Sequence, residues 1–183
     1  LVPEQKCELR VRTQPFAASV TVVTPKEFAG RETVYAGGRS AGKVQFRAAG
    51  KVGHAILAPD DPKVLADTRH AITDTGVLAV LDRVERAVAV ESRLGHPVQV
   101  LTDEYKFAGR VCDRYEVFCE RPHALRYAYR HVLYVDKETR LPVRYEAYEQ
   151  PLPGGPAGGE LVEAQSFVGL RANVGFGEAA FQR

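Results

Sequence analysis

Hydrophobic and polar residues alternate along the first part of the chain with a period of two, which is typical of strands that cover a core. The alternation predicts strands over residues 18–22, 31–36 and 43–48, each with its valine or phenylalanine side chains on one face. The glycine-rich residues 37–42 separate the last two and are typical of a hairpin connection.

The period changes to that of a helix over residues 76–93. Gly95 and Pro97 end this segment, and Arg83 is expected on its solvated flank. The side chains expected on the apolar face are Val77, Leu78, Leu81, Val84 and Val88. The sequence therefore predicts one main helix that packs against a sheet.

Strand patterns return after this helix, and a proline- and glycine-rich stretch at 151–159 is expected to form a mobile hairpin loop. The predicted strands are 98–107, 110–119, 126–136, 141–149 and 160–172. In the fourth of these, Val143 and Tyr145 are expected on the same face. Successive strands with one helix between two runs favour antiparallel pairing, so the predicted class is α+β, in a single domain over residues 1–183.

Length, composition and charge are those of an ordinary globular domain: 183 residues, 45% hydrophobic and 26% charged, with a net charge of +2. The small net charge and the mixed signs argue against a nucleic-acid-binding surface. No apolar stretch approaches the roughly 20 residues of a transmembrane helix. The chain begins with Leu1 and contains no methionine, so we expect that a native N-terminal segment such as a signal peptide is missing from it.

Two motifs with catalytic associations overlap in the loop at 37–44. Residues 38–42 fit G-x-S-x-G with Ser40 at the nucleophile position, and residues 37–43 fit G-x-x-x-x-G-K. Both motifs work only when a helix follows, and here the residues after Gly42 alternate as a strand. Val44 also stands where a phosphate-binding loop needs Ser or Thr. We interpret the loop as a hairpin and predict neither an enzyme nor a cofactor.

The histidines lack the spacing of a metal site, and no metal is predicted. They are His54, His70, His96, His123 and His131. His131, which stands among tyrosines on a predicted strand, is expected to be hydrogen-bonded in the core.

The three cysteines leave the redox state open. Cys112 and Cys119 would lie about 23 Å apart on one extended strand, too far for a disulfide unless the chain turns between them. Cys7 could pair with either one, and buried free thiols are the alternative that we favour.

Several stretches resemble an uncharacterised family of exported bacterial proteins, domain of unknown function 1571. The match spans nearly the whole chain and departs from the family pattern at 17–18 and 164–165. The stretches are Gln14-Pro15-Phe16, Ala29-Gly30-Arg31-Glu32, Arg69-His70-Ala71-Ile72-Thr73, Tyr134-Val135-Asp136-Lys137-Glu138, Leu141-Pro142-Val143-Arg144-Tyr145-Glu146 and Asn173-Val174-Gly175.

The family's strand pattern is similar to that of LolA-like lipoprotein carriers. The resemblance implies a curved antiparallel half-barrel with the helix on its concave face, in a periplasmic or otherwise exported protein. In that fold the groove binds acyl chains of lipoproteins or related lipids. The residues predicted to line such a groove are Val20, Val22, Val34, Val44, Phe46, Leu133, Val143 and Tyr145.

Three functional hypotheses follow. The first is a non-enzymatic exported domain that binds a lipid or a lipoprotein acyl chain, because each buried CH₂ group contributes about 0.8 kcal/mol. The same residues could instead form a closed core, in which case the protein is an envelope interaction or scaffold module. The third hypothesis, a hydrolase that uses Ser40, ranks last.

Overall fold

The computed structural model describes residues 4–119 and 127–182. The chain forms two compact units. The first unit contains residues up to Gly76 together with Asn173–Arg183, and the second contains Val77–Ala172.

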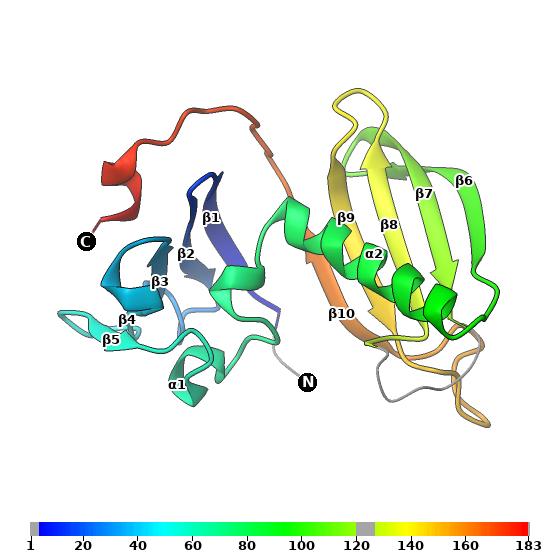
Figure 1. The fold of residues 1–183 in the computed structure, drawn as a ribbon, viewed down its shortest axis with the longest axis horizontal. Helices are drawn as coiled ribbons and strands as arrows, with labels where there is room; N and C mark the ends of the chain where they lie inside the picture. The colour runs from blue at the N-terminus through cyan, green and yellow to red at the C-terminus, as the bar shows by residue number, and fades with distance from the viewer. Residues whose placement is uncertain (1–3, 120–126, 183) are drawn as a thin grey trace. The chain divides into compact units, whose positions relative to one another are not determined.

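The first unit is built on a five-stranded antiparallel sheet in the order β1-β2-β3-β4-β5 (Figure 1, blue to cyan). The strands are β1 (Lys6–Thr13), β2 (Phe16–Thr24), β3 (Glu32–Ala36), β4 (Val44–Arg47) and β5 (Ala55–Leu57). The strands predicted at 18–22, 31–36 and 43–48 correspond to β2, β3 and β4. The sequence analysis did not identify β1 or β5, which carry mostly exposed side chains and therefore lack a clear apolar face.

Short helical segments accompany this sheet. They are η1 (Ser40–Gly42), α1 (Pro62–Leu65), η2 (Ile72–Asp74) and η3 (Glu178–Phe181). Helix α1 begins where it does because Asp61 caps it: Asp61 Oδ1 accepts a 2.8 Å hydrogen bond from the Lys63 backbone N–H. Pro62 occupies the first turn, where its missing N–H costs nothing.

Each face of the first sheet has its own apolar cluster, because successive side chains of a strand point to opposite faces. On one face, Val44 and Phe46 of β4 pack with Val64 of α1 and Ile72 of η2. On the other face, Ala17, Val34 and Ala36 pack with Phe181 of η3.

The second unit contains helix α2 (Val77–Arg93) and a second antiparallel sheet of five strands in the order β10-β9-β8-β7-β6. Its strands are β6 (Gln99–Phe107), β7 (Arg110–Phe118), β8 (Arg130–Asp136), β9 (Pro142–Tyr148) and β10 (Leu161–Ser166). Helix α2 lies across one face of this sheet (Figure 1, green). The prediction of antiparallel strands with one main helix is confirmed.

The strands form two sheets rather than one continuous sheet. Antiparallel neighbours are usually joined by short hairpins, whereas α1, η2 and α2 all lie between β5 and β6. β5 has only three residues and ends the first sheet. The half-barrel curvature of the sheet and the position of the helix on a concave face stay predictions. The assignment of residues 1–183 to a single domain also stays a prediction.

The apolar face predicted for the main helix was correct at Val84, which packs against the cluster beneath α2, and wrong at Leu78 and Leu81. Leu78 and Leu81 are 53% and 38% exposed, whereas Arg83 and Glu91 are 5% and 0% exposed. Val80, with no exposed surface, is the apolar residue of α2 at the centre of the contact with the sheet. Tertiary pairing overrides the apolar periodicity here, because Arg83 finds a buried carboxylate in the sheet.

Val143 and Tyr145 were wrongly predicted to share a face of β9. Tyr134 stands opposite Arg144 and Val135 opposite Pro142, so Val143 is the extra residue of a β-bulge. The bulge turns Val143 to the face of Tyr134, away from α2, while Tyr145 packs beneath α2.

The loop between β9 and β10 depends on a glycine at its base. Gly159 has a φ of +82°, and a Cβ added there would lie 1.8 Å from the backbone oxygen of Glu149. Gly154, in the same loop, has a φ of +80° but open space around the Cβ position. A residue with a Cβ would therefore be strained in its backbone at both positions, but it would clash with another part of the chain only at Gly159.

We expect Gly159→Ala to lower the free energy of unfolding by about 3 kcal/mol, because left-handed strain and a backbone clash add together. Gly154→Ala, the matched control, should cost about 1 kcal/mol from strain alone. Urea denaturation of both variants measures the difference. Equal losses would show that the loop relaxes and that the close approach has no structural role.

Candidate ligand-binding site

The residues predicted to line an apolar groove lie mostly within the packed clusters. Val44 and Phe46, together with partly buried Val20, belong to the cluster beside α1, and Val34 belongs to the cluster beside η3. Leu133 and Tyr145 pack beneath α2. Val22 is 2% exposed, and Val143 lies on the face of the second sheet away from α2. Phe46 and Val34 each also line a cavity of the first unit.

The cavity at Phe46 is an open groove of about 450 Å³ between the β4–β5 connection and α1. Its apolar lining comes from Phe46, Ala48, Val52, Ala55 and Leu57. Val52 is fully exposed. A volume of this size is within the range of about 300–1,000 Å³ that is typical of small-molecule sites.

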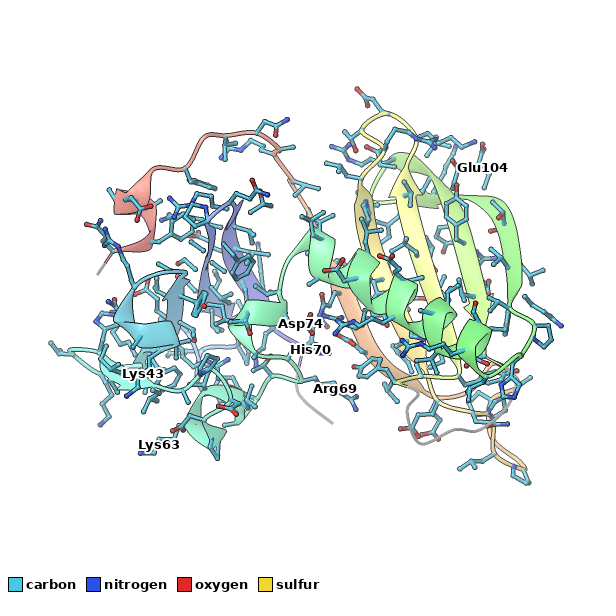
Figure 2. The ribbon with its side chains drawn as sticks, viewed as in Figure 1. Lys43, Lys63, Arg69, His70, Asp74 and Glu104 are labelled. Atoms are coloured by element: carbon cyan, nitrogen blue, oxygen red, sulfur yellow. The ribbon has the colours of Figure 1, made fainter. Side chains whose placement is uncertain are left out.

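Cationic side chains also line this groove. They are Lys51, from the β4–β5 connection, and Lys63, from α1 (Figure 2). His54, a further lining residue, lies with its Nε2 3.4 Å from Glu32 Oε2. Glu32 is 2% exposed and also accepts a 3.1 Å hydrogen bond from Arg47. The groove thus combines an apolar lining with two lysines, which suits an amphiphile with an acidic head group.

The helix-covered face of the second sheet has a different character, because ionic and polar groups are buried there. Arg83 Nη1 of α2 lies 3.2 Å from Glu163 Oε1 of β10, and their side chains are 5% and 6% exposed. Tyr127 donates a 2.6 Å hydrogen bond to Glu163 Oε2, and Gln165 donates one of the same length to Oε1. The Arg83 guanidinium also lies 5.5 Å from the centre of the Tyr145 ring. Both oxygens of Glu163 are thus engaged, and the arrangement holds the helix to the sheet.

His131 of β8 belongs to the same buried layer and is the core histidine that the sequence predicted. It has no exposed surface, and its Nδ1 lies 2.9 Å from the Tyr145 hydroxyl oxygen. Its Nε2 is buried without a hydrogen-bond partner among the described residues. Burial, helped by the positive charge of Arg83, lowers the pKa of His131 to about 4. Burial also raises the pKa of Tyr145 above its usual range. Both side chains are therefore neutral at physiological pH.

The catalytic motifs and the thiols can now be placed. β4 begins at Val44, directly after the loop that carries Ser40, so a strand occupies the place where both motifs require a helix. Within the described residues no group of three or more His, Cys, Asp or Glu could hold a metal; His123 lies outside them. Within the part of the chain that the structure describes, the cysteines form no disulfide: Cys112 and Cys119 are buried, and Cys7 is exposed.

Sequence reasoning missed the groove because, apart from Phe46, its lining comes mostly from a connection, from β5 and from α1, none of which was predicted as part of a site. One signal was present in the sequence. Val52 is a large apolar residue in a short polar stretch with Lys51, Gly53 and His54, where no strand or helix periodicity requires it.

The burial of His131 predicts how the free energy of unfolding depends on pH. The unfolded chain binds a proton at His131 near pH 6.5, whereas the folded protein does so only near pH 4. Stability from this group is therefore complete above pH 6.5 and is lost as the pH falls to 4, by about 3 kcal/mol in total. We expect His131→Gln, which can still hydrogen-bond Tyr145, to remove this part of the pH dependence of the free energy of unfolding, as measured by urea denaturation between pH 7 and 4. Parallel profiles for wild type and His131→Gln would contradict the assignment.

No helix among the described residues has both the length and the apolar character needed to span a membrane. A comparison with curated proteins finds no match. Similar solved structures include a LolA superfamily protein from Nitrosomonas europaea, with 10% identity and a TM-score of 0.27 over 81% of this chain and 54% of that one. A putative outer membrane lipoprotein-sorting protein domain from Vibrio parahaemolyticus has 11% identity and a TM-score of 0.42, over 93% of this chain and 65% of that one.

A third similar structure is the complex of the CwlD amidase from Clostridioides difficile with the GerS lipoprotein, with 14% identity and a TM-score of 0.43 over 92% of this chain and 84% of the matched chain. The chain thus spans less than two thirds of the LolA superfamily and lipoprotein-sorting structures. One family matches residues 1–183 in full, described as "Protein of unknown function (DUF1571)". The chain belongs to this family, as the resemblance in its sequence predicted.

Proposed function

We propose that this protein is a non-enzymatic, exported binding protein for an anionic amphiphile, such as a fatty acid or an acidic lipid, and that the ligand lies in the groove of the first unit. The observation that carries the proposal is the combination of an apolar lining at Phe46, Val52 and Leu57 with Lys51 and Lys63. The location in the cell envelope follows from the resemblance to exported bacterial proteins.

This proposal moves the ligand away from most of the residues first predicted to contact it. Val44, Leu133 and Tyr145 already have side-chain neighbours in the clusters, and opening those clusters would cost about 2–5 kcal/mol for each large apolar side chain that loses its packing. The groove needs no such opening. Phe46 keeps its predicted role as a ligand contact, because it belongs to the buried cluster and also lines the groove.

The free energies that the tail and the head group contribute predict a modest affinity for the amphiphile. A fully buried methylene contributes about 0.8 kcal/mol, so ten methylenes contribute roughly 8 kcal/mol before the cost of association. An open groove leaves part of the tail in water and reduces that gain. Two lysines attract the acidic head group, and salt screens this attraction because they lie at the surface.

We expect laurate to displace a fluorescent apolar probe from the wild-type protein, and Val52→Asp to weaken laurate binding at least about tenfold, since the bound tail would remove the new carboxylate from water. Val168→Asp is the matched control, because Val168 is a similarly exposed valine outside the groove. Lys51→Gln with Lys63→Gln should weaken laurate but leave dodecanol unchanged. The measurement is competitive displacement at low ionic strength.

Displacement that is equal in Val52→Asp and wild type would place the ligand elsewhere. If no probe binds at any concentration tested, the carrier proposal is wrong. The remaining hypothesis is then an interaction or scaffold module with a closed core. The surface available for such a module is edge strand β6, where Val100, Leu101 and Tyr105 are 53%, 57% and 45% exposed.

A further inference from the structure

A second cavity opens on the opposite face of the first sheet, where β3 and β4 meet η3. Its volume is about 200 Å³. Val34 and Phe181 supply apolar wall, Gln45 supplies an amide, and Arg39 and Lys43 supply positive charge. For comparison, a cavity of about 150 Å³ holds a benzene ring, so this space suits a ligand of amino-acid size.

Gln45 provides an acceptor that lacks a donor. It stands directly opposite Val34 in the β3–β4 ladder and lines the cavity. Its Oε1 is buried, and no hydrogen bond reaches that oxygen from the described residues. Buried polar atoms are nearly always paired. Rotation of the Gln45 amide about its terminal bond would turn this unpaired acceptor toward the cavity, where a ligand donor can reach it.

The positive charges are only partly neutralised. Lys43, which precedes β4 (Figure 2), forms no ion pair or side-chain hydrogen bond within the described part of the chain. Arg39 Nη2 lies 3.5 Å from Glu178 Oε2, but Glu178 also pairs with Arg12 at 2.7 Å. Gln182 can turn its amide oxygen to within 3.0 Å of Arg39 Nη1, which holds the guanidinium at the cavity without cancelling its charge.

We propose that this cavity binds a small carboxylate that also carries a hydrogen-bond donor, of the class of N-acylated amino acids. The carboxylate lies between Arg39 and Lys43, and the ligand's N–H donates to Gln45 Oε1. A small apolar side chain contacts Val34 and Phe181. Inorganic phosphate fits less well, because it has no apolar group to contact Val34 and Phe181.

The test is a titration of the full chain with N-acetyl-L-alanine, in which ligand-observed NMR measures the binding. We expect Lys43→Gln to weaken binding roughly tenfold, as for loss of one charge-assisted contact. Gln45→Leu should weaken binding by a similar factor and at the same time raise the Tm of the unliganded protein, because an unpaired buried acceptor is removed. A merely structural role for Gln45 would lower the Tm instead. Lys26→Gln is the control that should bind like wild type, because Lys26 is an exposed lysine of the first unit that lines neither cavity.

Three comparisons with other probes sharpen the outcome. N-acetyl-L-alanine amide, which lacks the charge, and propionate, which lacks the donor, should each bind at least tenfold more weakly than N-acetyl-L-alanine. Phosphate binding as tight as that of N-acetyl-L-alanine would overturn the assignment of a carboxylate with a donor. Absence of N-acetyl-L-alanine binding, or binding that Lys43→Gln and Gln45→Leu leave unchanged, would overturn the site. The laurate titration is read separately, so failure here leaves the groove proposal standing.

Discussion

The buried ion pair between Arg83 and Glu163 is the constraint on which the second unit depends. Two charges removed from water are tolerated only when they face each other and their remaining hydrogen-bonding positions are filled. Tyr127 and Gln165 fill those positions on Glu163, and this requirement sets which side of α2 faces the sheet. Leu78 and Leu81 are left exposed as a consequence. The helix is therefore held by polar chemistry where an apolar stripe would be the usual means.

That constraint also bears on where an apolar ligand can bind. A hydrocarbon tail placed beneath α2 would have to separate Arg83 from Glu163, which would leave buried charges without partners at a cost of several kcal/mol. The groove in the first unit presents no such obstacle, because its lysines lie at the surface and its lining is apolar. A half-open groove binds a ligand less tightly than a closed tunnel does. Weaker binding means faster dissociation, which the proposed role as a lipid-binding protein that releases its ligand requires.

Strand β4 connects the two proposed sites. Its residues alternate between faces, so Phe46 contributes to the groove and the preceding residue, Gln45, lines the cavity on the other side. The covering elements come from different parts of the chain, α1 on one face and the C-terminal η3 on the other. Because the sites share a strand but no lining residue, changes to one can be made without altering the chemistry of the other.

Local patterns in the sequence determined most of the secondary structure and the family. Period-two alternation located most of the strands, and helical spacing located α2. The alternation after Gly42 predicted a strand where both catalytic motifs need a helix. Each of these patterns depends on neighbours within a few residues. The face of α2, the bulge at Val143, the division into two sheets and both cavities were decided by tertiary structure alone. Arg83 is buried because Glu163, 80 positions away, lies opposite it. Phe46 and Gln45 line cavities because α1 and η3 leave space beside them. Periodicity records which residues can be buried, whereas long-range partners determine which of them are covered and which remain open to a ligand.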